Sequence, residues 1–143
     1  MLSSRETTCT ELENYTSNQI LMRALIVDDS RTMRMIISNI LQEIGFETGN
    51  ASNGLEALAW IDQNGFPEVS CVDWNMPEMN GLEFVREVRQ KPGNESMKIM
   101  MITTESEADN VMAALESGAN EYLMKPFTKD AVTDKLSLLG LNP

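Results

Sequence analysis

The sequence of 143 residues contains no histidine, and it has only two cysteines. Without histidine, the chain cannot hold a Ser-His-Asp triad, a histidine metal site or a phosphohistidine of its own. Cys9 lies in a polar segment and Cys71 in an apolar one, and two such cysteines do not make a disulfide framework. We therefore expect two reduced thiols in a cytoplasmic protein.

Long apolar runs and positive charge are also scarce. No stretch approaches the roughly 18 apolar residues that a membrane-spanning helix needs, and the N-terminus lacks the apolar core of a signal peptide. The 11 Lys and Arg residues face 22 Asp and Glu residues, which gives a net charge of −11. A protein that binds nucleic acid would need a face rich in Lys and Arg. We expect neither a membrane nor a nucleic acid among its partners.

Two regions differ in composition. Residues 1–21 are mostly Ser, Thr, Asn, Gln and Glu, so we expect a polar tail with at most a weak helix around residues 11–20. Met22 directly precedes the first apolar segment, and one hypothesis makes it the native start of the protein. Residues 22–143 have the length of one domain with a single core.

From Arg23 onward, short apolar segments alternate five times with segments of helical periodicity. Strands are expected at residues 24–27, 46–51, 69–73, 98–103 and 121–124, and the helices begin after the capping residues Ser30, Asn53, Asn80, Ser106 and Thr128. Such repeated units with short connections predict an α/β fold, a doubly wound five-stranded parallel sheet with helices on both faces. We expect the strand order 2-1-3-4-5, which is taken from proteins of this build rather than derived from the residues.

The apolar residues of each helical segment form a stripe that should face the sheet. The stripes are Met33, Ile36, Ile37, Ile40, Leu41 and Ile44; Leu82, Val85 and Val88; Ala108, Val111, Met112 and Leu115; and Val132, Leu136 and Leu139.

The segment Val69–Asp73 is the centre of the functional prediction. It is an apolar run that ends in one carboxylate, which should lie at the carboxyl edge of the sheet, where open α/β sheets bind ligands. The expected strand order brings Asp28 and Asp29, at the end of the first strand, to the same edge. Thr103 and Lys125 end the two strands on the other side of Asp73.

This grouping of charges favours a metal-dependent phosphoryl site. Adjacent carboxylates raise one another's pKa, and a divalent cation relieves their repulsion. Magnesium prefers oxygen ligands, so carboxylates and a backbone carbonyl suit it. With magnesium and the ammonium of Lys125, the three acids give a nearly neutral site for an arriving phosphoryl group. A carboxylate can be the attacking nucleophile, and we assign that role to Asp73, which stands alone on the central strand.

From Arg23 to about Gly140, the chain resembles the receiver domains of two-component response regulators, most closely the stand-alone chemotaxis type. The motifs that carry the resemblance are VDDSRTMR (27–34), DWNMP (73–77), GLE (81–83), ITTE (102–105), GA (118–119) and KPF (125–127). Each motif is weak alone, but the ordered set is specific. The resemblance implies a flavodoxin-like receiver fold. One departure is Asn80, where many members carry Asp, and we expect little effect because both residues cap helices.

The resemblance also implies roles for individual residues. Asp73 would accept a phosphoryl group from a partner histidine kinase, in a reaction that needs Mg²⁺. The metal would bind Asp29 and Asp73 directly, Asp28 through water, and Asn75 through its backbone carbonyl. Lys125 would pair with the phosphoryl group, and the Lys125–Pro126 bond would be cis, as is usual in this family.

The same resemblance implies a switch. Thr103 would hydrogen-bond the phosphoryl group and Tyr122 would follow, which would alter binding of a target protein on the face around Tyr122. Asn75 and Glu105 would tune dephosphorylation, in which a separate phosphatase could take part. Apart from self-phosphorylation and autodephosphorylation, we expect no enzymatic activity.

Other functions remain open at this point. A phosphatase with an aspartyl nucleophile would want a second acid two residues after Asp73, where this chain has Asn75. A flavin-binding module would want a phosphate-cradling loop after the first strand, and the acids Asp28 and Asp29 would repel phosphate there. Within two-component signalling, the protein could bind a flagellar motor or act as an intermediate phosphate carrier in a phosphorelay.

Overall fold

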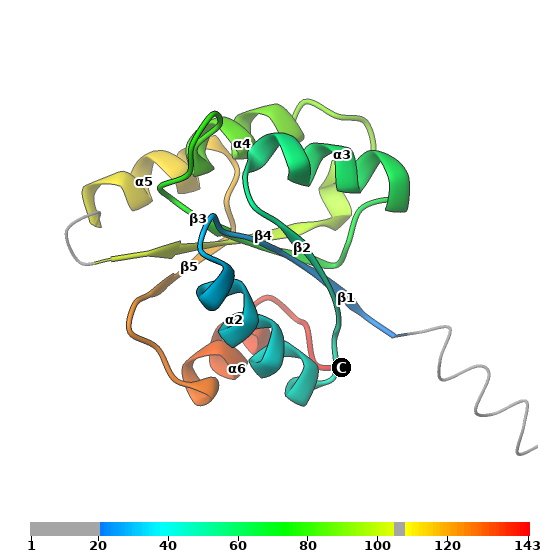
Figure 1. Ribbon diagram of the computed structural model, residues 1–143, viewed down its shortest axis with the longest axis vertical. Coiled ribbons are helices and arrows are strands. Elements are labelled where there is room, and N and C mark those ends of the chain that lie inside the picture. Colours follow the sequence, from blue (N-terminus) through cyan, green and yellow to red (C-terminus); the bar gives the residue numbers. More distant parts are fainter. Residues whose placement is uncertain (1–20, 105–107) are drawn as a thin grey trace, which may run out of the picture.

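The structure is a computed structural model that describes residues 21–104 and 108–143 (Figure 1). Within these ranges, five parallel strands form one sheet in the order β2-β1-β3-β4-β5. The strands are β1 (Arg23–Val27), β2 (Glu47–Ala51), β3 (Val69–Asp73), β4 (Lys98–Thr103) and β5 (Glu121–Met124). The doubly wound α/β fold and its strand order are confirmed.

Helices cover both faces of the sheet, with α3, α4 and α5 on one side and α2 and α6 on the other (Figure 1). Their bounds are α2 (Arg31–Ile44), α3 (Gly54–Asn64), α4 (Gly81–Val88), α5 (Ala108–Ser117) and α6 (Lys129–Leu138), with a short 3₁₀ helix η1 (Asn94–Ser96) before β4. Among the helices of the described ranges, none combines the length and the hydrophobicity that a membrane span requires.

The predicted helix caps are present wherever the structure describes them. Ser30, Asn53, Asn80 and Thr128 each accept a hydrogen bond from the backbone N–H three residues later. Asn80 also donates its own N–H to the carboxylate of Glu83, which completes a capping box. The predicted cap at Ser106, together with residues 1–20 of the predicted tail, lies outside the described residues.

Two of the predicted stripes are wrong in part. Ile36 is 44% exposed and Met112 is 60% exposed, whereas their neighbours Ile37 and Val111 are buried. Because successive residues are about 100° apart around a helix, only one of two adjacent apolar residues can face the sheet squarely. On α4, Phe84 is fully buried, although the predicted stripe omitted it.

The sheet separates two apolar clusters. One cluster includes Leu25, Val72 and Met101 and lies toward α3, α4 and α5, whereas the other includes Ile26, Cys71 and Ile102 and lies toward α2 and α6. Because side chains alternate along each strand, the central strands contribute to both clusters. All five residues of β3 are buried. Asp73 therefore ends a strand that is covered on both sides, which restricts where its carboxylate can lie.

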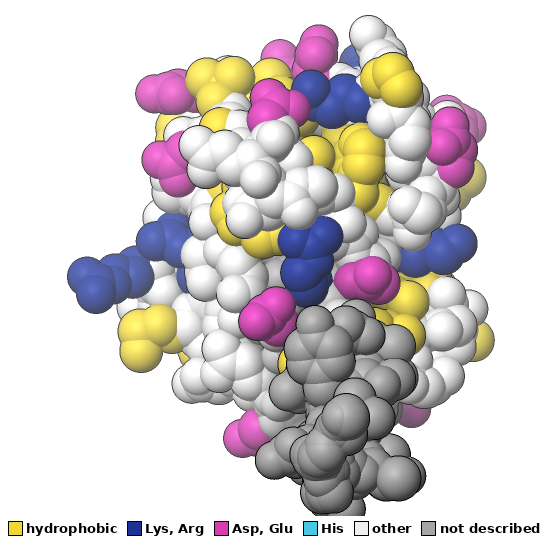
Figure 2. Space-filling model, turned by 90° about the vertical axis from the view of Figure 1, so that its right-hand side faces the viewer, with side chains coloured by type: hydrophobic (Ala, Val, Ile, Leu, Met, Phe, Trp, Pro, Cys, Tyr) yellow, Lys and Arg dark blue, Asp and Glu magenta, His cyan; other side chains and the backbone are white. Residues whose placement is uncertain are grey.

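The β2 edge of the sheet is held by an arginine from β1. The guanidinium of Arg23 lies 5.5 Å from the ring centroid of Trp60 on α3 and donates to the backbone carbonyls of Asn64 and Phe66. The face of the molecule that includes this edge carries Lys and Arg side chains among Asp and Glu side chains, despite the net charge of −11 (Figure 2). The contacts of Arg23 anchor α3 at the end of the sheet opposite the carboxyl edge.

Candidate functional site

The acidic residues gather where two neighbouring strands end. β1 pairs with β3 in a register that places Val27 opposite Val72, so the residues that follow them emerge side by side. Carboxylate oxygens of Asp28, Asp29 and Asp73 all lie within 4.8 Å of one another. The structure thus brings together the three acids that the sequence singled out, at the point where the strand order reverses.

Two of these acids are buried and poorly satisfied. Asp28 is 2% and Asp73 is 7% exposed, whereas Asp29 is exposed. One oxygen of Asp28, Oδ1, accepts the backbone N–H of Ser30 at 2.8 Å. The other, Oδ2, is buried without a hydrogen-bond partner among the described residues. Burial of an ionised oxygen without a partner is costly, so this atom is suited to bind a cation.

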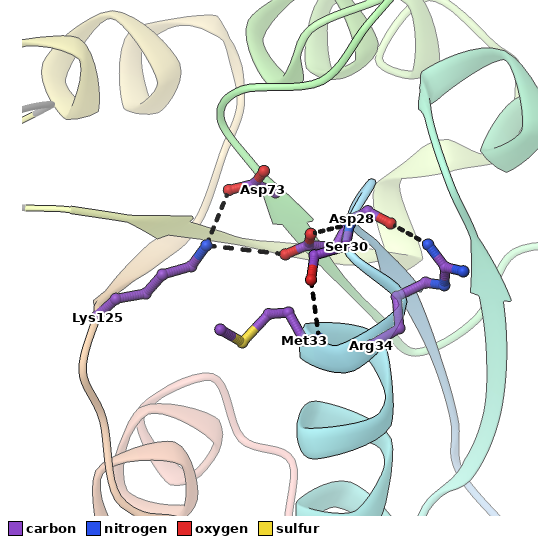
Figure 3. A network of polar contacts seen from close by, with 6 residues as sticks. All are labelled: Asp28, Ser30, Met33, Arg34, Asp73 and Lys125. Carbon is purple, nitrogen blue, oxygen red and sulfur yellow. Dashed lines mark hydrogen bonds and ion pairs between the residues drawn. The ribbon is translucent and has the colours of Figure 1, made fainter.

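Lys125 is the positive charge in the cluster (Figure 3). Its ammonium Nζ donates to Asp73 Oδ1 at 3.3 Å and lies 3.8 Å from Asp28 Oδ2. On the far side of Asp28, Arg34 donates to the backbone carbonyl of Asp28 at 2.6 Å rather than to its carboxylate. The three carboxylates thus have one ammonium among them, and the site keeps an excess of negative charge.

The pKa values reflect this environment. Burial, together with the charge of Asp28, raises the pKa of Asp73 to about 6 despite the opposing effect of Lys125. Burial also raises the pKa of Asp28, although the hydrogen bond from Ser30 and the charge of Lys125 oppose it. Carboxylate oxygens in this arrangement are ligands for a hard cation such as Mg²⁺. The unpartnered oxygen and the excess negative charge both fit such an ion.

The loop after Asp73 is held closely against the sheet. The N–H of Gly81 donates to the carbonyl of Trp74 at 2.9 Å, which closes the loop at the start of α4. A Cβ on Gly81 would lie 2.7 Å from the carbonyl oxygen of Asp73, so this position requires glycine. Within the loop, Glu78 has φ of 71°, and Met79 N–H bonds to Pro77 carbonyl across it in a γ-turn. The same loop carries Asn75, whose side chain is exposed.

The sequence did not single out Glu78 or Gly81 as parts of the site. A non-glycine residue in the left-handed region has no reliable sequence signature, because side chains of this kind rarely adopt it. For Gly81, the signal was present in its place directly after the capping residue Asn80. The close approach itself depends on how α4 packs against β3, which the local sequence does not report.

Thr103 and Lys125 end the strands beside Asp73. Thr103 is 1% exposed, and its carbonyl accepts the N–H of Lys125 at 2.7 Å. The Lys125–Pro126 peptide bond is cis, as the resemblance implied. Glu105 lies outside the described residues.

Tyr122 shares a face of the sheet with Thr103. Met101 is paired with Tyr122 across β4 and β5, and Thr103 lies two residues beyond Met101. Since side chains alternate along a strand, Thr103 and Tyr122 point to the same side. Tyr122 is half-buried and packs against the apolar cluster on the α5 side. A physical route from the acidic edge to Tyr122 is therefore short.

The fold and the site define a class of protein: a doubly wound α/β domain with an acidic pocket at the switch point of its sheet. Residues 24–137 match the model of the family described as the response regulator receiver domain, and the chain belongs to this family. The chain is a receiver domain homologous to CheY, consistent with a single-domain response regulator in two-component signalling.

Similar proteins support the chemotaxis type. The chain is 46% identical over 123 residues to the chemotaxis protein CheY1 of Helicobacter pylori, which covers 85% of this chain and 99% of that protein. It is 46% identical over 116 residues to a chemotaxis protein CheY homolog of Campylobacter jejuni, which covers 80% of this chain and 89% of that protein. The solved structure of CheY4 from Vibrio cholerae has a TM-score of 0.76 at 36% identity, over 82% of this chain and 98% of that one.

The raised pKa of Asp73 predicts a pH-dependent effect of Asp73→Asn on stability. The folded state binds the Asp73 proton more tightly than the unfolded state, so ionised Asp73 destabilises the fold above pH 6. Without divalent metal, Asp73→Asn should raise the free energy of unfolding by about 1–3 kcal/mol at pH 8 and by roughly half as much at pH 5. Urea unfolding at both pH values measures this.

The matched control is Asp62→Asn. The side chain of Asp62 is 66% exposed and pairs with Lys91 at 3.3 Å, an arrangement that contributes little to stability. It should give no comparable gain at pH 8. An increase for Asp73→Asn that is equal at pH 5 and pH 8 would contradict the electrostatic explanation.

Proposed function

We propose that Asp73 accepts a phosphoryl group from a partner histidine kinase in a Mg²⁺-dependent reaction, and that this modification switches the binding of a target protein. The observation that carries the proposal is the geometry of the acidic edge. Asp73 is buried, contacts Lys125 at 3.3 Å, and shares a 4.8 Å cluster with Asp28 and Asp29. In the receiver family, this set of residues suits phosphoryl transfer.

The metal site proposed here uses the acids in different ways. Asp29 and Asp73 would bind Mg²⁺ directly, Asp28 through water, and Asn75 through its backbone carbonyl. The unpartnered Oδ2 of Asp28 supports a cation on this side of the cluster. Bound Mg²⁺ would neutralise charge on the carboxylates and on the phosphoryl oxygens.

The protein's own residues would carry the transfer. A carboxylate oxygen of Asp73 would form a new O–P bond as the N–P bond to the kinase histidine breaks. A pKa of about 6 leaves Asp73 mostly ionised at neutral pH, as a nucleophile must be. Lys125, already directed at Asp73, would stabilise the negative charge of the phosphoryl oxygens. The hydroxyl of Thr103, at the end of the adjacent strand, would donate to one of them.

The output would come from the face formed by α5, β5 and α6. If Thr103 moves toward the phosphoryl group, it vacates space on the side of the sheet that it shares with Tyr122. The Tyr122 ring could then turn inward, and the surface around it would change shape. We propose this face as the binding site of the target protein.

Loss of the phosphoryl group would depend on water reaching Asp73. Asn75 and Glu105 would tune this access in self-dephosphorylation, and a separate phosphatase could assist. The amide of Asn75, two residues after Asp73, cannot serve as a general acid, which disfavours an aspartyl phosphatase. Two roles remain within signalling: control of a flagellar motor, as the chemotaxis relatives suggest, or carriage of phosphate in a phosphorelay. We also propose that residues 22–143 form one domain.

Mg²⁺ should bind the acidic edge in the absence of phosphate and change the fluorescence of Trp74, which adjoins Asp73. Asp29→Asn should weaken Mg²⁺ binding by about tenfold or more, because it removes a direct ligand. Affinity should also fall as the pH drops through 6, since protonated Asp73 binds the cation poorly. Fluorescence titration and calorimetry measure both effects, with Asp62→Asn as the control. If Mg²⁺ left both signals unchanged, the acidic edge would not be a metal site.

Incubation with a small acyl phosphate and Mg²⁺ should add one phosphoryl group that is labile in base. Asp73→Asn should abolish this modification. Lys125→Ala should slow it by about tenfold or more while changing Mg²⁺ affinity less, because Lys125 stabilises the phosphoryl charge without binding the metal. Lys129→Ala, an exposed lysine on α6, is the matched control. Intact-mass and peptide mass spectrometry measure the result, and a phosphoryl group mapped to Ser or Thr would refute the assignment.

Thr103→Ala should still accept the phosphoryl group but lose most of its effect on binding. The test uses a target protein isolated with the protein activated by beryllium fluoride, a phosphoryl mimic. The affinity of the wild type for this target should rise by about 1–3 kcal/mol upon activation, the usual size of an allosteric coupling. Thr133→Ala, which removes a hydroxyl from α6, is the control. Equal coupling in Thr103→Ala and the wild type would exclude the route through Thr103.

A further inference from the structure

Three contacts join Tyr122 to two charged neighbours. The ammonium of Lys135, on α6, lies 2.9 Å from Oε1 of Glu121 on β5. The same ammonium lies 4.4 Å from the centroid of the Tyr122 ring. Oε1 of Glu121 also accepts the backbone N–H of Tyr122 at 3.0 Å. One carboxylate oxygen therefore holds the lysine over the aromatic ring.

The position of β5 makes this arrangement feasible. β5 is an edge strand, and its adjacent residues Glu121 and Tyr122 point to opposite faces of the sheet. Glu121 is paired with Met100, which belongs to the cluster on the α6 side, whereas Tyr122 packs on the α5 side. Lys135 therefore reaches around the open edge of the sheet. It links the helix layer of α6 to the ring on the opposite face.

These contacts are shielded from solvent. The side chains of Lys135 and Glu121 are 27% and 20% exposed. Burial alone would raise the pKa of Glu121, but hydrogen bonds from Lys135 and from the Tyr122 N–H bring that pKa below its usual value. Glu121 is therefore ionised at neutral pH. A cation held over a tyrosine face is attracted more strongly when it is partly desolvated.

We propose that Glu121 and Lys135 form a latch that holds Tyr122 in its unmodified orientation and so opposes the switch. The inference rests on the proposed function, in which the Tyr122 ring turns inward when Asp73 carries a phosphoryl group. That turn would take the ring away from the ammonium of Lys135. The latch thus stabilises the resting state, and a ligand that favours the other state binds with a lower apparent affinity.

The test measures binding at the acidic edge, far from any surface where Lys135 might touch a partner. Lys135→Met keeps the apolar stem and removes the charge, and Glu121→Gln keeps the shape of the acid and releases the lysine. With Mg²⁺ present, Lys135→Met should bind beryllium fluoride about two- to fivefold more tightly than the wild type, as followed by Trp74 fluorescence. Glu121→Gln should change the affinity in the same direction by less.

A second readout follows Tyr122 directly. In protein labelled with 3-fluorotyrosine, Tyr122→Phe identifies the Tyr122 signal, because the chain has two tyrosines. In both latch variants without beryllium fluoride, the ¹⁹F resonance of Tyr122 should lie closer to the position that the wild type reaches when activated. A general effect of surface charge on α6 would not produce this shift.

The matched control is a second ion pair of the same helix. Lys129 on α6 lies 3.4 Å from Glu43 on α2, with side chains 50% and 64% exposed. Lys129→Met and Glu43→Gln should change neither readout. Wild-type affinity and an unshifted resonance in both latch variants would overturn the latch while leaving the switch intact. If beryllium fluoride bound the wild type without moving the Tyr122 resonance, both the latch and the proposed Tyr122 switch would be overturned.

Discussion

Repulsion among carboxylates at one edge of a buried sheet is the constraint on which this structure depends. Asp28 and Asp73 end strands whose side chains are almost entirely buried, so neither acid can relax into solvent. One ammonium, from Lys125, lies among three acids, and one oxygen of Asp28 has no hydrogen-bond partner among the described residues. The fold holds this unfavourable arrangement in place because the two apolar clusters fix β1 and β3 on both faces. Its instability is what makes the edge receptive to a cation.

The same packing fixes the surroundings of Asp73. α4 begins so close to β3 that Gly81 leaves no room for a side chain, and the loop before it contains the γ-turn at Glu78. A strained residue persists only where neighbouring structure holds it, and such residues gather at functional sites. The backbone that carries Asn75 is therefore constrained at both ends. This is the condition under which a backbone carbonyl can serve as a ligand.

Signal transmission in the proposed function depends on strand register. Thr103 and Tyr122 share a face of the sheet because Met101 is paired with Tyr122, and a shift by one residue would separate them. At the far end of this route, Lys135 and Glu121 hold the ring from the open edge of β5. The resting state then has an energy of its own, set by residues that do not touch the phosphoryl site. Variation at these two positions would tune the switch without altering Asp73 or its neighbours.

The sequence by itself determined the alternation of strands and helices, the capping residues and the candidate acids, because periodicity, caps and strand ends are local patterns. The meeting of Asp28, Asp29 and Asp73 followed only with a strand order taken from related proteins. Tertiary structure decided which of two adjacent apolar residues is buried, as at Ile36 and Ile37. It also decided the burial of Phe84, the turn at Glu78 and the contact of Lys135 with Tyr122. These features depend on how elements distant in sequence pack together, and no local pattern encodes that packing.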